Sequence, residues 1–454
     1  MGHPVSKRVA QRRRRVVRCA LLLLVALGCG RKPNVLLISL DACRPDHLSA
    51  YGYERDTSPF LAKLAARGVA FTHAFANTHG TPQSHTTILS SQYQETHRVM
   101  WDVLSDQGRG PGWVDAIPDD VVLLPEIMAR NGYVTLAVTD GGFMAGRLGF
   151  DRGFVEFQEA DGVRTGTAKL LEMVTRWIGD ERPIFAFYHT YEVHSPYLPP
   201  ASYRDLFGRF ESDFVPTAEN LAAFIERASD LSQGDIALIR ARYDAEIRFA
   251  DDTLRALFDG LAELGFLDDH LVIVTSDHGE EFGEHGGLLH LDRLYDELVR
   301  VPLIVSGARV PRGRVDDRMA SSVDIVPTIL RYTRSGDPAG FAGNDLLAPP
   351  RHRPDEQAVF MQYGNTRYAV RTRKWKLIEN VTATHAPHYE LYDLSEDPGE
   401  KNDVDARFPE VVADLRGLLT RWKTMAGSRA AESKQVILDP ELLERLRALG
   451  YARE

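Results

Sequence analysis

The chain is poor in cysteine and lacks a hydrophobic run long enough to cross a membrane. Among its 454 residues there are three cysteines, Cys19, Cys29 and Cys43. The apolar stretch at residues 19–27 has nine residues, whereas a membrane-spanning helix needs about 20. If Cys19 is removed with a leader and Cys29 is modified, Cys43 has no partner, so no internal disulfide is expected. Stability must then come from a hydrophobic core or from a bound metal.

Basic charge is scarce outside the N-terminus. Residues 1–28 contain seven of the 54 lysines and arginines and no acidic residue. The rest of the chain therefore has 47 basic against 64 acidic residues, a formal net charge near −17. Nucleic-acid binding depends on clustered basic side chains that neutralise phosphates. The acidic body argues against a nucleic-acid partner.

The first 29 residues are typical of an export signal. A basic region precedes the apolar stretch, and Gly28 and Cys29 follow it, which is the order of a secretory leader. Residues 26–29, "ALGC", are similar to the lipobox of bacterial lipoproteins, whose cysteine is lipidated. We expect an exported lipoprotein of the bacterial cell envelope, held at the outer membrane or in the periplasm through lipidated Cys29. An ordinary secreted protein and an uncleaved anchor are the alternatives.

Apolar runs that end in polar residues alternate with helical patterns along the chain. Strands are predicted at 34–42, 132–140, 183–197 and 270–286, and helices at 57–68, 122–132, 167–180 and 242–265. This alternation predicts an α/β fold: a large domain at 33–345 with a mainly parallel or mixed central sheet flanked by helices. Ligands of such sheets collect beyond the carboxyl ends of the strands. Residues 200–241 lack a strand signal and are interpreted as an insertion near the site mouth.

A second, smaller unit is predicted at the C-terminus. Residues 334–356 are rich in Gly, Pro and charge, which indicates a boundary. Three short strand patterns follow, and then helical patterns at 408–425 and 439–449. We expect residues 346–454 to form an α+β subdomain with an antiparallel sheet and terminal helices.

Acidic and histidine side chains follow two of the predicted strands. Asp277 and His278 end one strand, with His285 and His290 shortly after, and Asp41 ends another. Carboxylate and imidazole together favour Zn or Mn over the all-oxygen ligands that Ca prefers. A buried Asp41 needs a partner, and a metal shared with Asp277 would supply it. The alternative is that these polar residues only cap strands and helices or bind loop amides.

The stretch "NTHGTPQSHTTILSS", residues 77–91, contains an apparent helix start. Pro82 suits the first helical position, which makes Thr81 the predicted N-cap. A hydroxyl there also lies at the positive end of the helix dipole, where a metal would favour its alkoxide and helix amides could hold an anion. Thr81 is therefore a candidate both for a cap and for a nucleophile.

Several ordered motifs resemble the sulfatase family of the alkaline phosphatase superfamily. They are "NVLLISLDA", "RPDHLSAYGYERDTSPFLAKLAARGVAFTHAFA", "TPQSHTTILSS", "HSPY", "SDHGEEFGEHG", "LYDELVRVPLIV", "SVDIVPTIL" and "YELYDLSEDPGEKND", and the resemblance runs from Asn34 to the last residues, "LDPELLERLRALGY". It covers nearly the whole chain after the leader.

The resemblance implies a role for each matching residue. Asp41, Asp277 and His278, with Thr81, are the implied ligands of one divalent metal. Thr81 stands where the family has the Cys or Ser that is oxidised to formylglycine. Further implied catalytic residues are His85, His194 and His290, of which His85 replaces an Arg and His290 a Lys. His189 and His285 are the predicted substrate-binding residues.

Departures from the family pattern change the expected chemistry. Threonine is not a known source of formylglycine, so none is expected. Ala42 replaces the second Asp of the paired motif, which shifts the expected metal from Ca towards Zn or Mn. We expect a metal-dependent hydrolase of sulfate or phosphate esters that forms a covalent intermediate on Thr81. The substrate would be a small molecule, glycan or lipid. The alternatives are a transferase of phosphate-linked groups to envelope glycans or lipids, and an inactive binder of sulfated or phosphorylated glycans.

Overall fold

A computed structural model describes residues 32–102, 113–290, 292–337, 340–349, 357–382 and 384–450. The leader, with its predicted lipidation at Cys29, lies outside the described residues. None of the helices in these ranges has an apolar stretch that could span a lipid bilayer.

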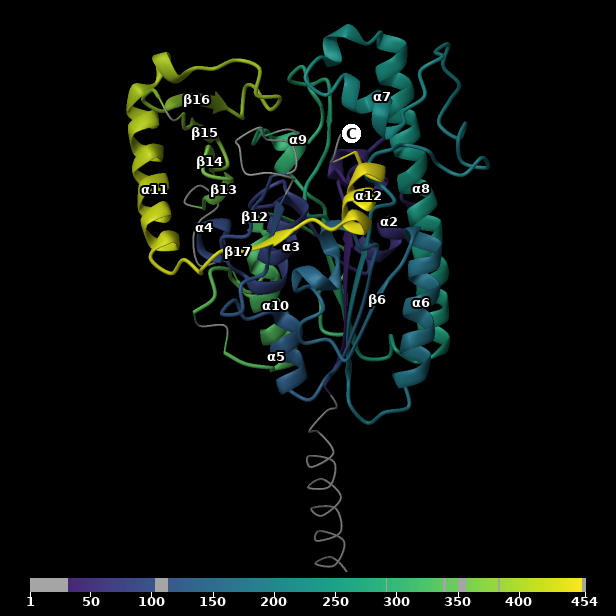
Figure 1. Cartoon of the computed structure of the whole chain (residues 1–454). Coiled ribbons are helices and arrows are strands. Elements are labelled where there is room, and N and C mark those ends of the chain that lie inside the picture. The colour runs from purple at the N-terminus through teal and green to yellow at the C-terminus, as the bar shows by residue number, and fades with distance from the viewer. Residues whose placement is uncertain are drawn as a thin grey trace, which may run out of the picture.

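An eight-stranded mixed sheet forms the centre of the large domain (Figure 1). Its order is β12-β2-β11-β8-β1-β7-β5-β6. All of these strands run in one direction except β11, which is antiparallel to both of its neighbours. The strands are β1 (Asn34–Leu40), β2 (Gly68–Phe75), β5 (Val134–Thr139), β6 (Glu156–Glu159), β7 (Ile184–Thr190), β8 (His270–Thr275), β11 (Leu303–Gly307) and β12 (Arg314–Ser321).

Helices cover both faces of this sheet because its central strands are apolar on both sides. In β1, Val35 and Leu37 join one core, while Leu36, Ile38 and Leu40 join the other. The first core is covered by α3 (Thr81–Ser90), α5 (Leu124–Arg130), α10 (Ile325–Thr333) and α12 (Pro440–Ala448). The second is covered by α2 (Pro59–Ala66), α6 (Gly162–Trp177) and α8 (Gln233–Glu263).

The predicted α/β fold is confirmed. The four strands predicted from sequence correspond to β1, β5, β7 and β8, which lie together in the sheet. The largest difference is α8, which begins at Gln233 inside the span interpreted as an insertion. Ser232 accepts a hydrogen bond from the Asp235 amide and starts α8 with a capping box. The rest of that span contains α7 (Ala218–Ala223), the 3₁₀ helix Ala228–Asp230 and turns.

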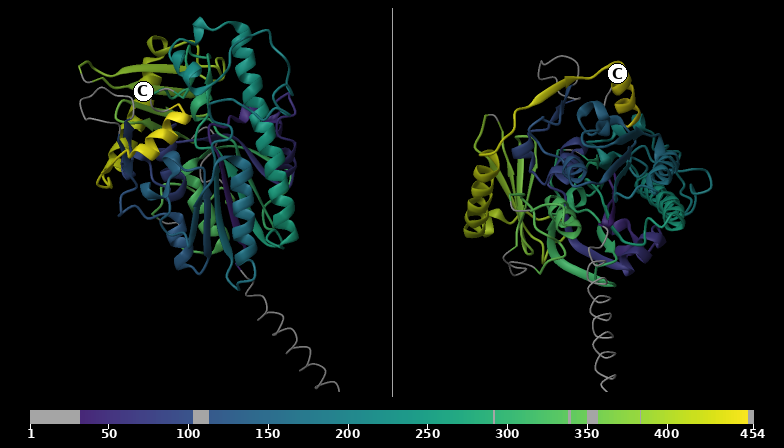
Figure 2. Two further views of the ribbon diagram at one scale, coloured as in Figure 1. Left: turned by 45° about the vertical axis from the view of Figure 1, so that its right-hand side comes forward. Right: turned by 90° about the horizontal axis from the view of Figure 1, so that it is seen from below.

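A separate four-stranded antiparallel sheet forms the small C-terminal unit, as predicted. Its strands are β13 (Val359–Tyr363), β14 (Arg367–Arg371), β15 (Trp375–Asn380) and β16 (His388–Asp393), paired in sequence order. One face packs against α11 (Pro409–Gly427) through Leu415, Leu419 and Trp422. Figure 2 shows this sheet and α11 beside the large domain.

The C-terminal segment returns to the large domain instead of staying with the small sheet. Strand β17 (Lys434–Ile437) pairs with β4 (Trp113–Ala116), which also pairs with β3 (Trp101–Asp102). Leu442 and Leu446 of α12 are buried in the large-domain core. The path from α11 to α12 is visible in both views of Figure 2.

Candidate active site

Three neighbouring strands, β8, β1 and β7, end at the same edge of the sheet. Asp41 follows β1, Asp277 and His278 follow β8, and His189 lies near the end of β7. All four side chains are buried. His189 Nε2 lies 3.1 Å from Asp41 Oδ2, so the pairing of β1 with β7 brings these two residues into contact. The sheet edge thus brings together residues that are far apart in the sequence.

Three atoms at this edge have the arrangement of a metal site. His278 Nε2 lies 3.5 Å from Asp41 Oδ1 and 3.4 Å from Asp277 Oδ2. Within the described residues, none of these three buried atoms has a hydrogen-bond partner. Buried polar atoms without a partner are costly, and a shared cation would satisfy all three. The predicted ligands Asp41, Asp277 and His278 therefore fit a divalent metal.

The hydrogen bonds of the imidazoles distinguish this set from another nearby group. His278 Nδ1 lies 2.7 Å from the carbonyl oxygen of Gly279, so Nδ1 carries the proton and Nε2 offers its lone pair. Asp41, His85 and His189 also lie close enough to hold a metal. However, both nitrogens of His85 already have partners, the Thr81 carbonyl at 2.9 Å and Ser39 Oγ at 2.9 Å. His85 therefore fits a structural role better than a ligand role.

The two carboxylates differ in their preferred protonation state. Burial raises the pKa of Asp41 well above its ordinary value, and the negative charge of Asp277 raises it further. Burial also opposes ionisation of Asp277, but the imidazoles of His278, His85 and His189 lower its pKa to about 2. The pair carries one negative charge more readily than two, which is the condition that a bound cation relieves.

Thr81 is the first residue of α3, not its N-cap as predicted. The N-cap is Gly80, whose carbonyl accepts the first helical hydrogen bond from the Ser84 amide at 2.8 Å. Pro82 accordingly falls at the second helical position. A Cβ on residue 80 would lie 2.3 Å from Oε1 of Gln83, so the end of that side chain would have to shift. Thr81 is buried and is not the N-cap of α3.

The first turns of α3 are attached directly to the metal-ligand loop. Ser84 Oγ donates a hydrogen bond to the carbonyl oxygen of Asp277 at 2.7 Å. His85 Nδ1 lies 3.6 Å from Asp277 Oδ2. Both contacts place the helix that begins with Thr81 against the Asp277 carboxylate.

Two further predicted histidines lie beside the metal-ligand group. The rings of His278 and His290 have centroids 4.4 Å apart, and those of His290 and His194 are 4.9 Å apart. His290 Nδ1 is 3.0 Å from Glu280 Oε1, and Tyr197 donates to the other oxygen of that carboxylate at 2.7 Å. Burial lowers the pKa of His194 to about 3 and that of His290 well below its ordinary value. Both imidazoles are therefore neutral near pH 7.

His285 lies in a different cluster from the other predicted site residues. Its Nδ1 bonds Glu297 Oε1 at 2.5 Å and its Nε2 bonds the carbonyl of Glu400 at 2.9 Å. Its ring stacks on Tyr295 at 3.6 Å. Since both nitrogens donate, the ring is cationic and offers no lone pair to a metal, although Glu281, His285 and Glu297 are close together. These contacts engage both ring nitrogens and one ring face of His285, and its role in substrate binding stays a prediction.

The charge of His285 gives a pH-dependent prediction. Burial lowers its pKa, but the bond to Glu297 outweighs burial and the net pKa is raised. A raised folded-state pKa stabilises the fold below the unfolded pKa, about 6.5, and this contribution is lost as pH rises through the folded value. The difference in unfolding free energy between the wild type and His285→Asn should therefore shrink from pH 6 to pH 9 in urea titrations. A difference that grows with pH would contradict this assignment.

His79 is a residue of this region that sequence reasoning missed. It is buried, two residues before Thr81, and stacks on Tyr363 of the small sheet with centroids 4.2 Å apart. Neither ring nitrogen has a hydrogen-bond partner among the described residues. Burial, and then His278 and His290, lower its pKa well below the ordinary value. Its position close to Thr81 was the signal in the sequence. Its contact with Tyr363 could not be predicted, because the two residues are far apart in the chain.

Removing one ligand should remove the metal. In Asp277→Asn, one carboxylate oxygen and its charge are lost, so metal affinity should fall by about 100-fold or more, measured by elemental analysis after dialysis. Asp140→Asn is the matched control because Asp140 is also a carboxylate directly after a strand, β5, where it accepts from Thr190 Oγ1 at 2.7 Å. Equal metal content in both variants would exclude the Asp41, Asp277 and His278 site.

Comparison with known proteins agrees with this fold. A family model described as sulfatase matches residues 33–335, and one described as N-sulphoglucosamine sulphohydrolase, C-terminal, matches residues 283–424. The chain belongs to the sulfatase family, which confirms the resemblance in its motifs. Members of this family usually bind a divalent metal, consistent with the candidate cluster.

Individual relatives are distant. Arylsulfatase K of Gallus gallus is 24% identical over 453 residues, covering 86% of this chain and 82% of that protein. The multifunctional alkaline phosphatase superfamily protein PehA of Trinickia caryophylli is 31% identical over 193 residues, 37% of each chain. Among solved structures, the phosphonate monoester hydrolase of Agrobacterium radiobacter superposes with a TM-score of 0.70 at 22% identity, over 90% of this chain and 100% of that one.

A second solved structure holds another protein bound to that protein's own substrate, D-glucosamine-2-N,6-O-disulfate. It has a TM-score of 0.71 and 17% identity, and covers 88% of this chain and 99% of that one. At these identities both structural neighbours establish the fold of the present chain and not its substrate.

Proposed function

We propose that the chain is a metal-dependent hydrolase of sulfate or phosphate esters in which Thr81 is the nucleophile. Family membership supports ester hydrolysis, and the relatives include arylsulfatases and a phosphonate monoester hydrolase. The observation that carries the proposal is the contact between the start of α3 and the Asp277 loop, with Ser84 Oγ 2.7 Å from the Asp277 carbonyl. This contact packs the helix that Thr81 begins against the loop of Asp277, one of the proposed metal ligands, which supports a role for Thr81 beside the metal.

Asp41, Asp277 and His278 would hold the metal, and Zn or Mn suit two carboxylates and an imidazole better than Ca. When bound there, a divalent cation supplies positive charge that lowers the pKa of the Thr81 hydroxyl and offsets charge on the transferred group. His189 donates to Asp41 Oδ2 and so fixes the orientation of that carboxylate. His85 holds the first turn of α3 through the Thr81 carbonyl.

The reaction begins with attack of Thr81 Oγ1 on the sulfur or phosphorus atom. The hydroxyl proton passes to a neighbouring neutral imidazole as the new oxygen bond forms. The ester bond to the leaving alcohol breaks, and the departing oxygen takes up the proton that Thr81 released, carried by His194 or His290, which are neutral and can accept it first. Water then displaces Thr81 from the covalent ester and releases sulfate or phosphate. Backbone amides at the N-terminus of a helix such as α3 are suited to hold oxygens of the transferred group.

We also propose the class of substrate and the location of the protein in the cell. A sulfated or phosphorylated small molecule, glycan or lipid fits a buried site of this charge, and threonine in place of the formylglycine precursor favours phosphate esters. We propose an exported protein, anchored at the envelope membrane through lipidated Cys29. Radiolabelled palmitate incorporated into the wild type and absent from Cys29→Ser would support the anchor; labelling of neither protein would contradict it.

Turnover of matched aryl esters tests the activity. Purified protein should be assayed on aryl sulfate, phosphate and phosphodiester with the same leaving group, before and after treatment with a chelator. We expect turnover of at least one ester that chelation removes and Zn or Mn restores. Turnover of sulfate alone would overturn the preference for phosphate. If none of the esters is cleaved while sulfated glycans bind, the chain is a binding protein and the proposed hydrolysis is wrong.

A further inference from the structure

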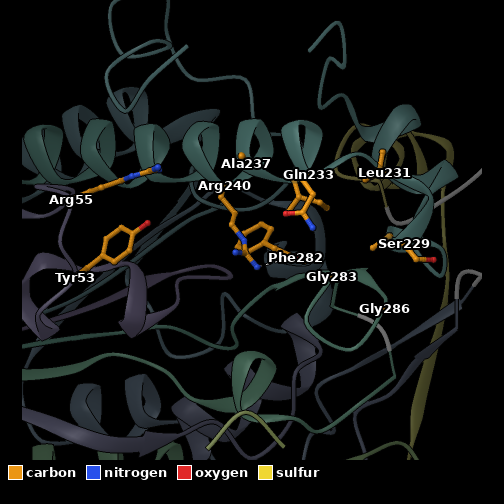
Figure 3. A pocket seen from close by; sticks show the side chains of 12 residues that line it. Tyr53, Arg55, Ser229, Leu231, Gln233, Ala237, Arg240, Phe282, Gly283 and Gly286 are labelled. Carbon is orange, nitrogen blue, oxygen red and sulfur yellow. Dashed lines mark hydrogen bonds between the residues drawn. The ribbon is translucent and has the colours of Figure 1, made fainter. Parts of the chain in front are cut away.

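A cavity of about 570 Å³ lies between α8 and the loop after the metal ligands (Figure 3). Its volume is in the range of small-molecule sites, about 300–1,000 Å³. None of the predicted catalytic or metal residues lines it. Its walls come from the start of α8, from the segment after β1, and from the turn that contains Phe282 and Gly283. It is therefore a second cavity, separate from the candidate active site.

The charged residues that line the cavity are both arginines. Arg55 lies beside Tyr53 at one end, and Arg240 lies over Phe282 in the middle (Figure 3). No acidic side chain is among the lining residues. The charged side chains that line the cavity are thus positive, which favours an anionic ligand.

Each arginine has an acidic partner outside the cavity lining, so each is held in place. Asp244 is fully buried and bonds Arg55 Nη1 at 2.7 Å. Glu284 Oε1 bonds Arg240 Nη2 at 3.1 Å and also pairs with Arg44 at 2.9 Å. Each ion pair thus fixes the position of a guanidinium group. It uses only some of that group's five N–H donors and leaves the others for a ligand.

One of those donors is buried and unused. Arg240 Nε has no hydrogen-bond partner among the described residues, although it is shielded from solvent. Although Nε itself is shielded, the Arg240 side chain is 40% exposed and that of Arg55 is 29% exposed, so other guanidinium donors can meet an anionic oxygen in the cavity. Planar guanidinium groups bind carboxylate, sulfate and phosphate oxygens in this way.

The remaining lining suits a compound with hydroxyl groups and an apolar face. The rings of Tyr53 and Phe282 supply apolar surface, and the amide of Gln233 and the hydroxyl of Ser229 supply further hydrogen-bonding atoms. Sugar rings combine these features, and a sugar acid adds the anion that the arginines require.

We propose that this cavity is a binding site for an anionic sugar unit, held by Arg240 and Arg55. The site is independent of the proposed hydrolysis, because its residues are not those of the catalytic group. It is nevertheless connected to that group. Phe282 packs on Tyr243 with centroids 4.9 Å apart, and the Tyr243 hydroxyl donates to the Ala42 carbonyl at 2.7 Å, next to Asp41.

Calorimetric titration with glucuronate tests the site, with glucose as the neutral probe. The wild type should bind glucuronate and bind glucose at least about tenfold more weakly, since the anion supplies the main contact. Arg240→Gln should weaken glucuronate binding by about tenfold or more. The matched control is Arg242→Gln on the same helix, whose partners are Arg204 and Asp205 and which does not line the cavity. It should bind as the wild type does.

A second variant blocks the cavity without changing its charge. Ala237 lines the wall on α8, so Ala237→Phe should also weaken binding by about tenfold or more if the ligand occupies this space. Thermal unfolding shows whether each variant remains folded.

Three results would overturn the site. They are no glucuronate binding to the wild type, equal binding of glucose, or wild-type binding by both Arg240→Gln and Ala237→Phe. Binding lost in Asp277→Asn but kept in these two variants would place the sugar acid at the metal group instead.

Discussion

Replacing Thr81 by alanine should lower kcat/KM for ester cleavage by about 10³-fold or more, with no change in metal content. The loss follows because the variant has no hydroxyl to form the covalent ester, while Asp41, Asp277 and His278 keep their ligand atoms. Thr86→Ala is the matched control. Its hydroxyl lies in the same helix and donates to the Pro82 carbonyl at 2.6 Å, so its removal should leave the rate nearly unchanged.

The nature of the nucleophile can be separated from its presence. Thr81→Ser keeps the hydroxyl and should retain most of the activity, within about tenfold. Mass spectrometry of acid-quenched wild-type protein during turnover should find the transferred group on the peptide that contains Thr81. Full activity in Thr81→Ala would exclude Thr81 as nucleophile. A modified peptide elsewhere in the chain would assign the intermediate to another residue.

The metal group was predictable because its signal is local in each strand. An acidic residue at the end of a buried apolar run indicates a functional strand end, and parallel strands bring such ends together. Asp41 and Asp277 follow this rule, because β1 and β8 pair in parallel and end at the same edge of the sheet. Hydrogen bonds decide which imidazole has a lone pair to offer a metal, and these could not be predicted from the sequence. For example, His85 bonds Ser39, which is far away in the chain.

Other features depended on contacts between distant segments. His285 belongs to the same motif as Asp277, yet its partners Glu297 and Glu400 place it at the junction with the small unit. The return of β17 to β4 joins segments more than 300 residues apart. The predicted start of α3 is wrong by one position because the N-cap is Gly80, which has no side chain to signal a cap in the sequence.

Lys376 shows how the small unit supports the metal-ligand loop. It is fully buried, and its Nζ lies 2.9 Å from Asp296 Oδ1 and 2.8 Å from Glu400 Oε1. Asp296 begins the short helix α9 (Asp296–Val299). Backbone carbonyls of α9 accept hydrogen bonds from the amides of Gly279 at 2.8 Å and Glu280 at 3.0 Å. The charge network of the small sheet thus holds the backbone directly after His278.

Replacing Lys376 by methionine should therefore lower the free energy of unfolding by about 3–5 kcal/mol, because two buried carboxylates lose their shared cation. Burial raises the pKa of Glu400 to about 7 even with Lys376 present, so this carboxyl should become protonated in the variant and limit the loss. The double variant Lys376→Met, Glu400→Gln should be more stable than Lys376→Met alone. Urea unfolding followed by circular dichroism measures both.

The neighbouring Lys374 is the control for this experiment. Its side chain is 56% exposed and lies 3.5 Å from Asp393, so Lys374→Met should change stability by less than about 1 kcal/mol. Equal effects of the two substitutions would show that burial of Lys376 adds nothing. If Lys376→Met also weakens metal binding at a temperature where it is fully folded, the cause is the link from Asp296 through α9 to Gly279. Lys376 contacts Asp296 and Glu400, and the far end of this link is the Gly279 carbonyl that bonds His278 Nδ1, so metal affinity in this variant measures how rigidly the small unit holds that loop.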